Sequence, residues 1–356
     1  MVEGAGSSER VVAFLLAMGV DAEEVERAAA EDRLDLLVVD QVLFPADHHY
    51  TLPELAELAG LGVAELRRLW LALGLPDVDD GAPVFTDADV EAATTFHGLV
   101  LLRMLDDEAA IQLARVIGSA MARIAEAEIG ASPVARGEAG SAEMAELFAL
   151  SADATLPSIA RLLEYTWRRH LRTAARRAML APGQGRLGHG EVPLTVGFAD
   201  LVGFTRLSQE IAGSDLAEVI GRFEALAHDT VTRNGGRVVK TIGDEVMWVV
   251  PEPAAGAQIA LGVAEGCARD ELVSDVRVGL AHGQVLSRDG DCYGPVVNLA
   301  SRVVGIARPG TVLVSQEVRD ALAGEEDLVF SALRRPRALK DVGRVHLHRL
   351  SRVGGD

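Results

Sequence analysis

Cysteines and long apolar runs are both scarce in this sequence. Only two of the 356 residues are cysteine, Cys267 and Cys292, which argues against a disulfide framework and for a reducing compartment. No stretch of 18 consecutive apolar residues is present, so we expect no transmembrane segment. The N-terminal segment carries acidic and polar side chains where a secretory signal would be basic. The sequence therefore predicts a cytoplasmic protein.

Lysine is almost absent. Two of the 34 basic side chains are lysine, Lys240 and Lys340, and the rest are arginine. A compact ammonium and a flat guanidinium fork serve different binding geometries. Each lysine is therefore a candidate for a role that arginine does not fill.

Positive charge is also in short supply, especially in the first half of the chain. The formal net charge is −19; residues 1–190 contain 30 acidic and 16 basic side chains (net −14), and residues 191–356 contain 23 and 18 (net −5). Affinity for nucleic acid comes largely from basic side chains that neutralise phosphates, so we expect no nucleic-acid partner.

A hydrophobic content of 49% predicts a folded chain, and the length predicts two or three domains.

Residues 1–180 carry the apolar periodicity of helices. We expect a helix at 21–30, which Asp21 would cap. Apolar residues at helical spacing run almost without a break from Ala88 to Ile129, and another long helix is expected at roughly Leu156–Leu180. These patterns predict an all-α N-terminal domain.

Residues 50–99 resemble the helix-turn-helix of MerR-type transcription regulators. A capped helix begins at Thr51, a glycine-containing turn follows, and a second helix begins at Val63. Taken alone, this pattern predicts DNA binding. The segment contains nine acidic groups and only two basic ones, Arg67 and Arg68, which disfavours phosphate contacts. A scaffold used for packing or dimer contacts is therefore favoured, with a DNA-binding regulator as the alternative.

Residues 181–192, APGQGRLGHGEV, have the composition of a linker. His189 lies in this segment, and His170 lies in the arginine-rich helix before it. Histidine changes charge near neutral pH, so both residues are candidates for a regulatory role. For His189, an exposed loop residue without a role is the simpler interpretation.

Two aspartates follow β-branched runs in the second half of the chain. Asp200 and Asp244 each end an apolar strand pattern beside a glycine turn, so they are expected at neighbouring strand ends. A pair of carboxylates on rigid strands suits Mg²⁺ or Mn²⁺, which leaves coordination positions for water and substrate phosphates. Glu245 follows Asp244 directly and is expected to point to the opposite face of its strand. The pattern predicts a metal site for phosphoryl chemistry.

Strands and helices alternate beyond the linker. The order strand, helix, strand, strand, helix, strand predicts a ferredoxin-like βαββαβ core in a domain at 193–356, and thus an α+β fold for the chain. The expected strands are 194–200, 237–242, 245–250, 275–281, 311–314 and 345–349, and the expected helices are 206–233, 254–269 and 296–306.

Three motifs together resemble the catalytic domain of class III adenylyl cyclases: FADLVGFT, VVKTIGDEV and DGDCYGPVVNLASRV. The resemblance covers about residues 192–350. It implies that Asp200 and Asp244 bind two divalent cations and that Lys240 and Asp291 select adenine.

The resemblance also assigns roles on the helix expected at 296–306. It implies that Asn298 orients the ribose and that Arg302 stabilises the transition state. In this family the metal aspartates come from one subunit and the other four residues from its partner, so a homodimer with two composite sites is implied. The helical half resembles the regulatory domain of some actinobacterial, pH-responsive adenylyl cyclases, which implies autoinhibition.

The residue chemistry agrees with ATP as substrate. Adenine has a ring-nitrogen acceptor beside an amino donor. Lys240 can donate to the ring nitrogen, and Asp291 can accept from the amino group. The backbone N–H groups of Gly203, Phe204 and Thr205 are expected at a helix start, where they suit phosphate oxygens. The expected reaction is conversion of ATP to 3′,5′-cyclic AMP and pyrophosphate.

Two alternatives remain at this stage. One is the DNA-binding regulator, in which the cyclase-like half only senses nucleotide. The other is a diguanylate cyclase, because Gly243-Asp-Glu is similar to the GGDEF signature of that family. Ile242 before this glycine and Lys240 both favour the adenylyl cyclase.

Overall fold

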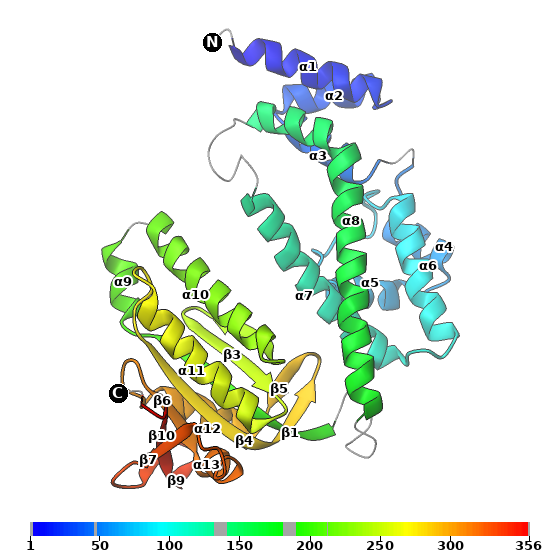
Figure 1. The fold of residues 1–356 in the computed structure, drawn as a ribbon. Coiled ribbons are helices and arrows are strands. Elements are labelled where there is room, and N and C mark those ends of the chain that lie inside the picture. Colours follow the sequence, from blue (N-terminus) through cyan, green and yellow to red (C-terminus); the bar gives the residue numbers. More distant parts are fainter. Residues whose placement is uncertain (1–2, 46–47, 132–140, 181–189, 212, 355–356) are drawn as a thin grey trace. The chain divides into compact units, whose positions relative to one another are not determined.

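The computed structural model describes residues 3–45, 48–131, 141–180, 190–211 and 213–354 (Figure 1). The chain divides into two compact units, residues 1–177 and 178–356. The first unit is helical, and the second combines helices with a mixed sheet. The predicted α+β fold, with a helical region before a ferredoxin-like domain, is confirmed.

Three short helices open the first unit: α1 (Glu3–Ala17), α2 (Ala22–Ala30) and α3 (Leu34–Leu43). Asp21 caps α2 as predicted, because its side chain accepts a hydrogen bond from the N–H of Glu23. Buried residues from all three helices form one small core, which consists of Val11, Leu15, Val25 and Val38.

The segment that resembles a helix-turn-helix contains α4 (Leu52–Ala59), α5 (Val63–Ala72) and the start of α6 (Asp87–Leu101). Capping boxes begin α4 and α6, formed by Thr51 with Glu54 and by Thr86 with Asp89. Leu52, Leu55, Leu66 and Phe85 belong to the core that joins these helices.

The long helices of this unit differ from the prediction. The expected helix from Ala88 to Ile129 is divided into α6 and α7 (Asp107–Ala131) by a break at 102–106, where Arg103 has a left-handed backbone (φ 53°). The helix expected at 156–180 begins earlier, so that α8 spans Ser141–Leu180 and contains Pro157. Apolar periodicity alone did not locate either boundary.

The sheet of the second unit begins with four antiparallel strands in the order β2-β3-β1-β4. This is the order of a ferredoxin-like core. The strands are β1 (Gly190–Leu201), β2 (Arg237–Ile242), β3 (Glu245–Val250) and β4 (Val276–Arg288). The helix predicted at 206–233 is divided into α9 (Phe204–Glu210) and α10 (Gly213–Arg233), and α11 (Pro253–Arg269) follows β3.

Two cores lie on opposite faces of this sheet. On β3, Val246, Trp248 and Val250 belong to the core with α10 and α11, whereas Met247 and Val249 belong to the core with α12 (Pro295–Val304). This alternation is the period of two residues that a strand buried on both faces requires. In Figure 1, α10 and α11 lie along one face.

The sheet continues beyond the four-stranded core. β6 (Val312–Ser315) pairs parallel to β4, followed by β10 (Leu347–Arg352) and β7 (Leu328–Ala332). β5 (Asp291–Tyr293) pairs only with the end of β4, while β8 (Arg337–Leu339) and β9 (Gly343–Val345) form a separate hairpin. Sequence patterns did not predict β7, β8, β9 or α13 (Gln316–Ala321).

None of the helices described is long and apolar enough to cross a membrane. Both cysteines are buried and unbridged.

Candidate active site

Asp200 and Asp244 come together at one end of the sheet. Asp200 is near the end of β1, and Asp244 lies in the turn between β2 and β3, where Gly243 has a left-handed backbone (φ 64°). The N–H of Leu201 donates to the carbonyl oxygen of Asp244 over 3.2 Å and ties the turn to β1. Burial and the nearby charge of Asp244 raise the pKa of Asp200 above its ordinary value.

Glu245 belongs to the same acidic group, so the prediction that it points away from the site is wrong. Glu245 on β3 pairs directly with Asp200 on β1, and residues that are paired across antiparallel strands project from the same face. Burial, followed by the charges of Asp200 and Asp244, raises the pKa of Glu245 to about 7. Sequence reasoning considered only the alternation along β3 and not its register with β1.

The side chain of Arg277 faces this group from the next strand. Arg277 on β4 pairs with Asp200 on the other side of β1, and its Nη1 lies 3.9 Å from the Asp200 carboxylate. The charge of Arg277 lowers the pKa of Asp200 but does not cancel the effects of burial and of Asp244. The acidic group therefore retains excess negative charge, as expected of a site that receives a cation.

The two aspartates fit a hard divalent cation. No group of three or more His, Cys, Asp or Glu side chains in the described ranges has the arrangement of a complete metal site. Mg²⁺ needs only one or two protein carboxylates when water and substrate phosphates fill its other positions. Asp200 and Asp244 match that donor set.

Lys240 and Asp291 form the second part of the site. Lys240 on β2 donates to Oδ2 of Asp291 on β5 over 2.6 Å, and the N–H of Cys292 donates to Oδ1 over 2.7 Å. Burial alone raises the pKa of Asp291, but these hydrogen bonds outweigh it and the pKa lies below its ordinary value. The result is an ammonium and an ionised carboxylate side by side.

Asn298 and Arg302 lie one helical turn apart on the exposed side of α12. Arg302 Nη2 lies 3.8 Å from Asp341, and about half of the Arg302 side chain (49%) is exposed to solvent. α12 packs closely on β4 because Gly279 has no side chain there; an added Cβ would lie 2.8 Å from the carbonyl oxygen of Ala300. The position of both polar residues thus depends on this contact.

Gly203, Phe204 and Thr205 begin α9. Gly203 is its N-cap with a left-handed backbone (φ 76°), and the first hydrogen bonds within the helix are donated by Arg206 and Leu207 to the carbonyl of Gly203. The N–H groups of Phe204 and Thr205 therefore lie before the first hydrogen bonds of the helix, among the N–H groups for which a helix offers no internal acceptor. Their proposed phosphate contacts remain a prediction.

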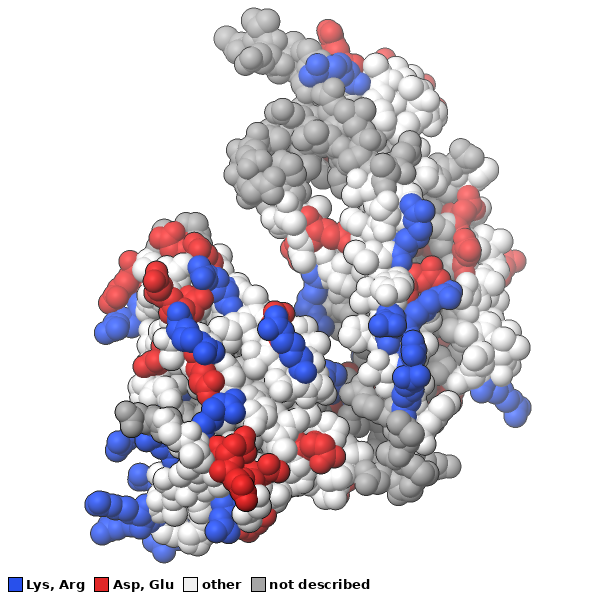
Figure 2. Space-filling view, in the orientation of Figure 1, with Lys and Arg blue, Asp and Glu red and all other residues white. Residues whose placement is uncertain are grey.

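The candidate regulatory histidines have no demonstrated role. His170 is exposed on α8, whose basic side chains are visible in Figure 2 on the face drawn. His189 lies outside the described residues.

The two basic residues of the segment 50–99 are already ion-paired within this unit. Arg67 contacts Asp77 and Asp80, and Arg68 Nη2 lies 2.8 Å from Glu108. This pairing further reduces the capacity of the segment for phosphate, beyond its acidic composition.

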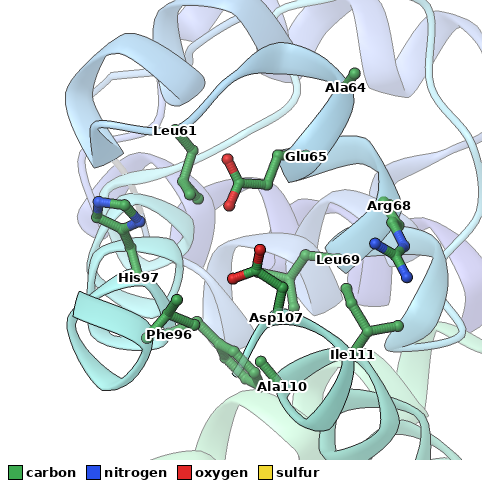
Figure 3. Close-up of a pocket in the computed structure, with 11 residues that line it drawn as sticks. Leu61, Ala64, Glu65, Arg68, Leu69, Phe96, His97, Asp107, Ala110 and Ile111 are labelled. Atoms are coloured by element: carbon green, nitrogen blue, oxygen red, sulfur yellow. The ribbon is translucent and has the colours of Figure 1, made fainter. Parts of the chain in front are cut away.

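A cavity of about 300 Å³ lies between α5, α6 and α7 in the first unit (Figure 3). Leu61, Leu69, Phe96, Val100 and Ile111 supply apolar walls. Its polar lining includes Glu65, Asp107 and His97, whose Nδ1 is buried without a hydrogen-bond partner among the described atoms. Among the described residues that line this cavity, none is a predicted site residue.

Comparison with known families accounts for both units. Residues 189–349 match the adenylate and guanylate cyclase catalytic domain, and residues 2–174 match the adenylate cyclase regulatory domain.

Three relatives are similar over most of the chain. The adenylate cyclase of Glutamicibacter nicotianae is 38% identical over 295 residues, which cover 78% of this chain and 73% of the relative. The adenylate cyclase of Streptomyces coelicolor is 36% identical over 312 residues, covering 86% and 81%. The pH-sensitive adenylate cyclase MT1302 of Mycobacterium tuberculosis is 33% identical over 361 residues, covering 98% and 89%. This chain therefore belongs to the adenylate cyclases that combine an adenylate cyclase regulatory domain with a class III catalytic domain.

Proposed function

We propose that this protein converts ATP to 3′,5′-cyclic AMP and pyrophosphate. The single observation that carries the proposal is the contact of Lys240 with Asp291, 2.6 Å long, on the same domain as the paired carboxylates of Asp200 and Asp244. The ammonium can donate to the ring nitrogen of adenine while the carboxylate accepts from its amino group. Guanine reverses this donor and acceptor order, so ATP is favoured over GTP.

The reaction needs positioning more than covalent participation by the protein. The ribose 3′-oxygen forms a bond to the α-phosphorus, the bond from that phosphorus to the bridging oxygen breaks, and the 3′-hydroxyl proton is released. Asp200 and Asp244 would hold two divalent cations, which supply charge stabilisation and activation of the hydroxyl. The N–H groups of Gly203, Phe204 and Thr205 would bind phosphate oxygens.

Asn298 and Arg302 would act on the ribose and on the charge that develops at phosphorus. A guanidinium places several donors on one phosphate group, and stabilisation of this kind is often the largest contribution to catalysis. The exposure of both residues on α12 suits a site that is completed by another molecule. We therefore propose a homodimer in which one copy supplies the aspartates and its partner supplies Lys240, Asp291, Asn298 and Arg302.

We also propose that the helical unit restrains the catalytic domain and that this restraint responds to pH. The support is a relative named for pH sensitivity and the position of His170 and His189 before the catalytic domain. A helical unit that joins two catalytic domains can set how often their half-sites meet.

The direct test is incubation of the purified full-length protein with ATP or GTP and either Mg²⁺ or Mn²⁺. Cyclic AMP and pyrophosphate should form in equal amounts, and cyclic GMP should form far more slowly. Mixing Asp244→Ala with Arg302→Ala protein should restore part of the activity if the sites are shared between copies. Absence of cyclic AMP under all these conditions rejects the proposal.

A further inference from the structure

Lys240 is not the only side chain of β2 that holds the segment around Asp291. Arg237 Nη1 donates to the carbonyl oxygen of Gly290 over 2.7 Å, and its Nη2 lies 3.9 Å from Sγ of the buried Cys292. Lys240 donates to the carboxylate of the residue between these two. Two cations of one strand thus contact three consecutive residues.

A β-bulge places both cations on the same side of the sheet. Arg237 and Lys240 are three positions apart, and in a regular strand such side chains point to opposite faces. The pairing of β2 with β3 shifts between Val238 and Lys240, so that Arg237 pairs with Val249 and Lys240 with Met247. Val249 and Met247 belong to the same core, on the α12 face. Bulges are known to re-aim side chains in this way.

The segment that Arg237 contacts contains one buried residue, Cys292, which belongs to the core on the α12 face. β5 has only three residues, Asp291–Tyr293, and it pairs with β4 alone. Asp289 and Gly290 join the two strands with left-handed backbones (φ 53° and 82°), the geometry of a tight type I′ hairpin turn. This turn fixes Asp291 relative to β4 but not relative to Lys240. The bond from Arg237 to the Gly290 carbonyl connects the hairpin to β2 in addition to the bond that Lys240 itself makes to Asp291.

We propose that Arg237 is a positioning residue for nucleobase selection, which holds the Gly290–Cys292 segment so that the Asp291 carboxylate stays beside the Lys240 ammonium. This inference rests on the proposed adenine-binding role of Lys240 and Asp291. Arg237 itself does not contact the base. It acts by keeping donor and acceptor at a fixed separation, and discrimination between bases depends on that separation because an unmatched polar group in the site carries an energetic cost.

The test compares Arg237→Met, which keeps the apolar stem, with Arg237→Lys, which keeps the charge but not the fork. Arg233→Met is the matched control, because Arg233 is exposed and pairs with Asp229 on its own helix. For each protein, kcat and KM for ATP are measured, together with competition by GTP. Hydrogen exchange of residues 286–293 reports the order of the hairpin without nucleotide.

Arg237→Met should raise KM for ATP and lower the preference for ATP over GTP, each by about tenfold, the effect of losing one charged hydrogen bond. It should also speed exchange in the hairpin, while kcat changes much less. Arg237→Lys should recover part of the preference, and Arg233→Met should match the wild type.

If Arg237→Met shows faster hydrogen exchange in the hairpin but an unchanged preference for ATP over GTP, the role of Arg237 is merely structural and the inference is overturned. If Arg237→Met does not fold, Arg237→Lys decides, because an unchanged preference in that variant overturns the inference as well. A wild-type protein that makes no cyclic AMP would instead reject the proposed function.

Discussion

Asp200 on β1 and Glu245 on β3 are direct partners across the sheet, so two carboxylates leave the same face beside Asp244. The pKa of Glu245 rises from 4.5 in a free chain to about 7 here. The folded protein therefore binds a proton that the unfolded chain releases. This contribution to stability is complete below about pH 4.5 and is lost as the pH rises through about 7.

In the metal-free protein, we expect the contribution of Glu245 to the free energy of unfolding to fall by about 1 kcal/mol as the pH rises from about 4.5 to about 7. This value is reduced because Glu245 is partly exposed to solvent. Glu245→Gln should remove most of this dependence of the unfolding free energy on pH and leave the smaller part that comes from Asp200. Urea unfolding at pH 5 and pH 8, in the presence of a chelator, measures the difference. An equal change in unfolding free energy between the two pH values for variant and wild type would contradict the prediction.

Removal of one of the two carboxylates proposed to bind metal should abolish turnover without unfolding the domain. Asp244→Asn should lower the rate of cyclic AMP formation by at least about 10³-fold, because both the cation and its activation of the hydroxyl are lost. Binding of Mn²⁺, measured by electron paramagnetic resonance without nucleotide, should weaken in parallel. Asp229→Asn is the control, since Asp229 is an exposed carboxylate paired with Arg233. Full Mn²⁺ affinity in Asp244→Asn would show that the cation binds elsewhere.

Reversal of one base-reading group should change substrate preference. Lys240→Glu places a second carboxylate against Asp291 and removes the proposed donor for the adenine ring nitrogen. We expect kcat/KM for ATP to fall by at least about 100-fold, within the range seen when buried polar partners are left unmatched. The decrease for GTP should be smaller. Initial rates with both nucleotides measure it, and an equal decrease for the two would argue against base reading by Lys240.

The contact of α12 with β4 should be intolerant of one added methyl group. Gly279→Ala would press a Cβ against the backbone of Ala300 and Val304 and should destabilise the fold by about 1–3 kcal/mol. Cyclase activity should fall further than stability alone explains, because Asn298 and Arg302 move with the helix. Gly221→Ala on α10, where an added Cβ meets no atom within 4 Å, should be neutral or slightly stabilising. Wild-type kinetics in Gly279→Ala would refute this argument.

Cleavage between the two units should release the proposed restraint. A protease site inserted within residues 181–189 allows the same preparation to be assayed before and after cutting. Cyclic AMP formation should rise several-fold, most of all at the pH where the intact protein is slowest. An intact chain that is as fast as the cut one at every pH would rule out autoinhibition.

Local pattern located the core strands and the glycine turns, but β1 (Gly190–Leu201) and β4 (Val276–Arg288) are longer than the strands expected at 194–200 and 275–281. β2 and β3 have the expected bounds, because β-branched runs that end at glycine leave few alternatives. The same patterns placed Asp200 and Asp244 at neighbouring strand ends. Helix boundaries were less predictable: the breaks near Arg103 and Ile211 occur within sequences that remain apolar at helical spacing.

The sequence by itself determined which chemical groups are present and roughly where each strand ends, since these depend on residue type and short-range spacing. Only the tertiary structure decided that Glu245 joins the aspartates and that Arg237 lies on the same face as Lys240. The first result depends on the register between β1 and β3, which are far apart in sequence. The second depends on a bulge at Val239, which shifts the register between the neighbouring strands β2 and β3. A shift of one residue reverses the face of a side chain, and nothing within a single strand specifies that shift.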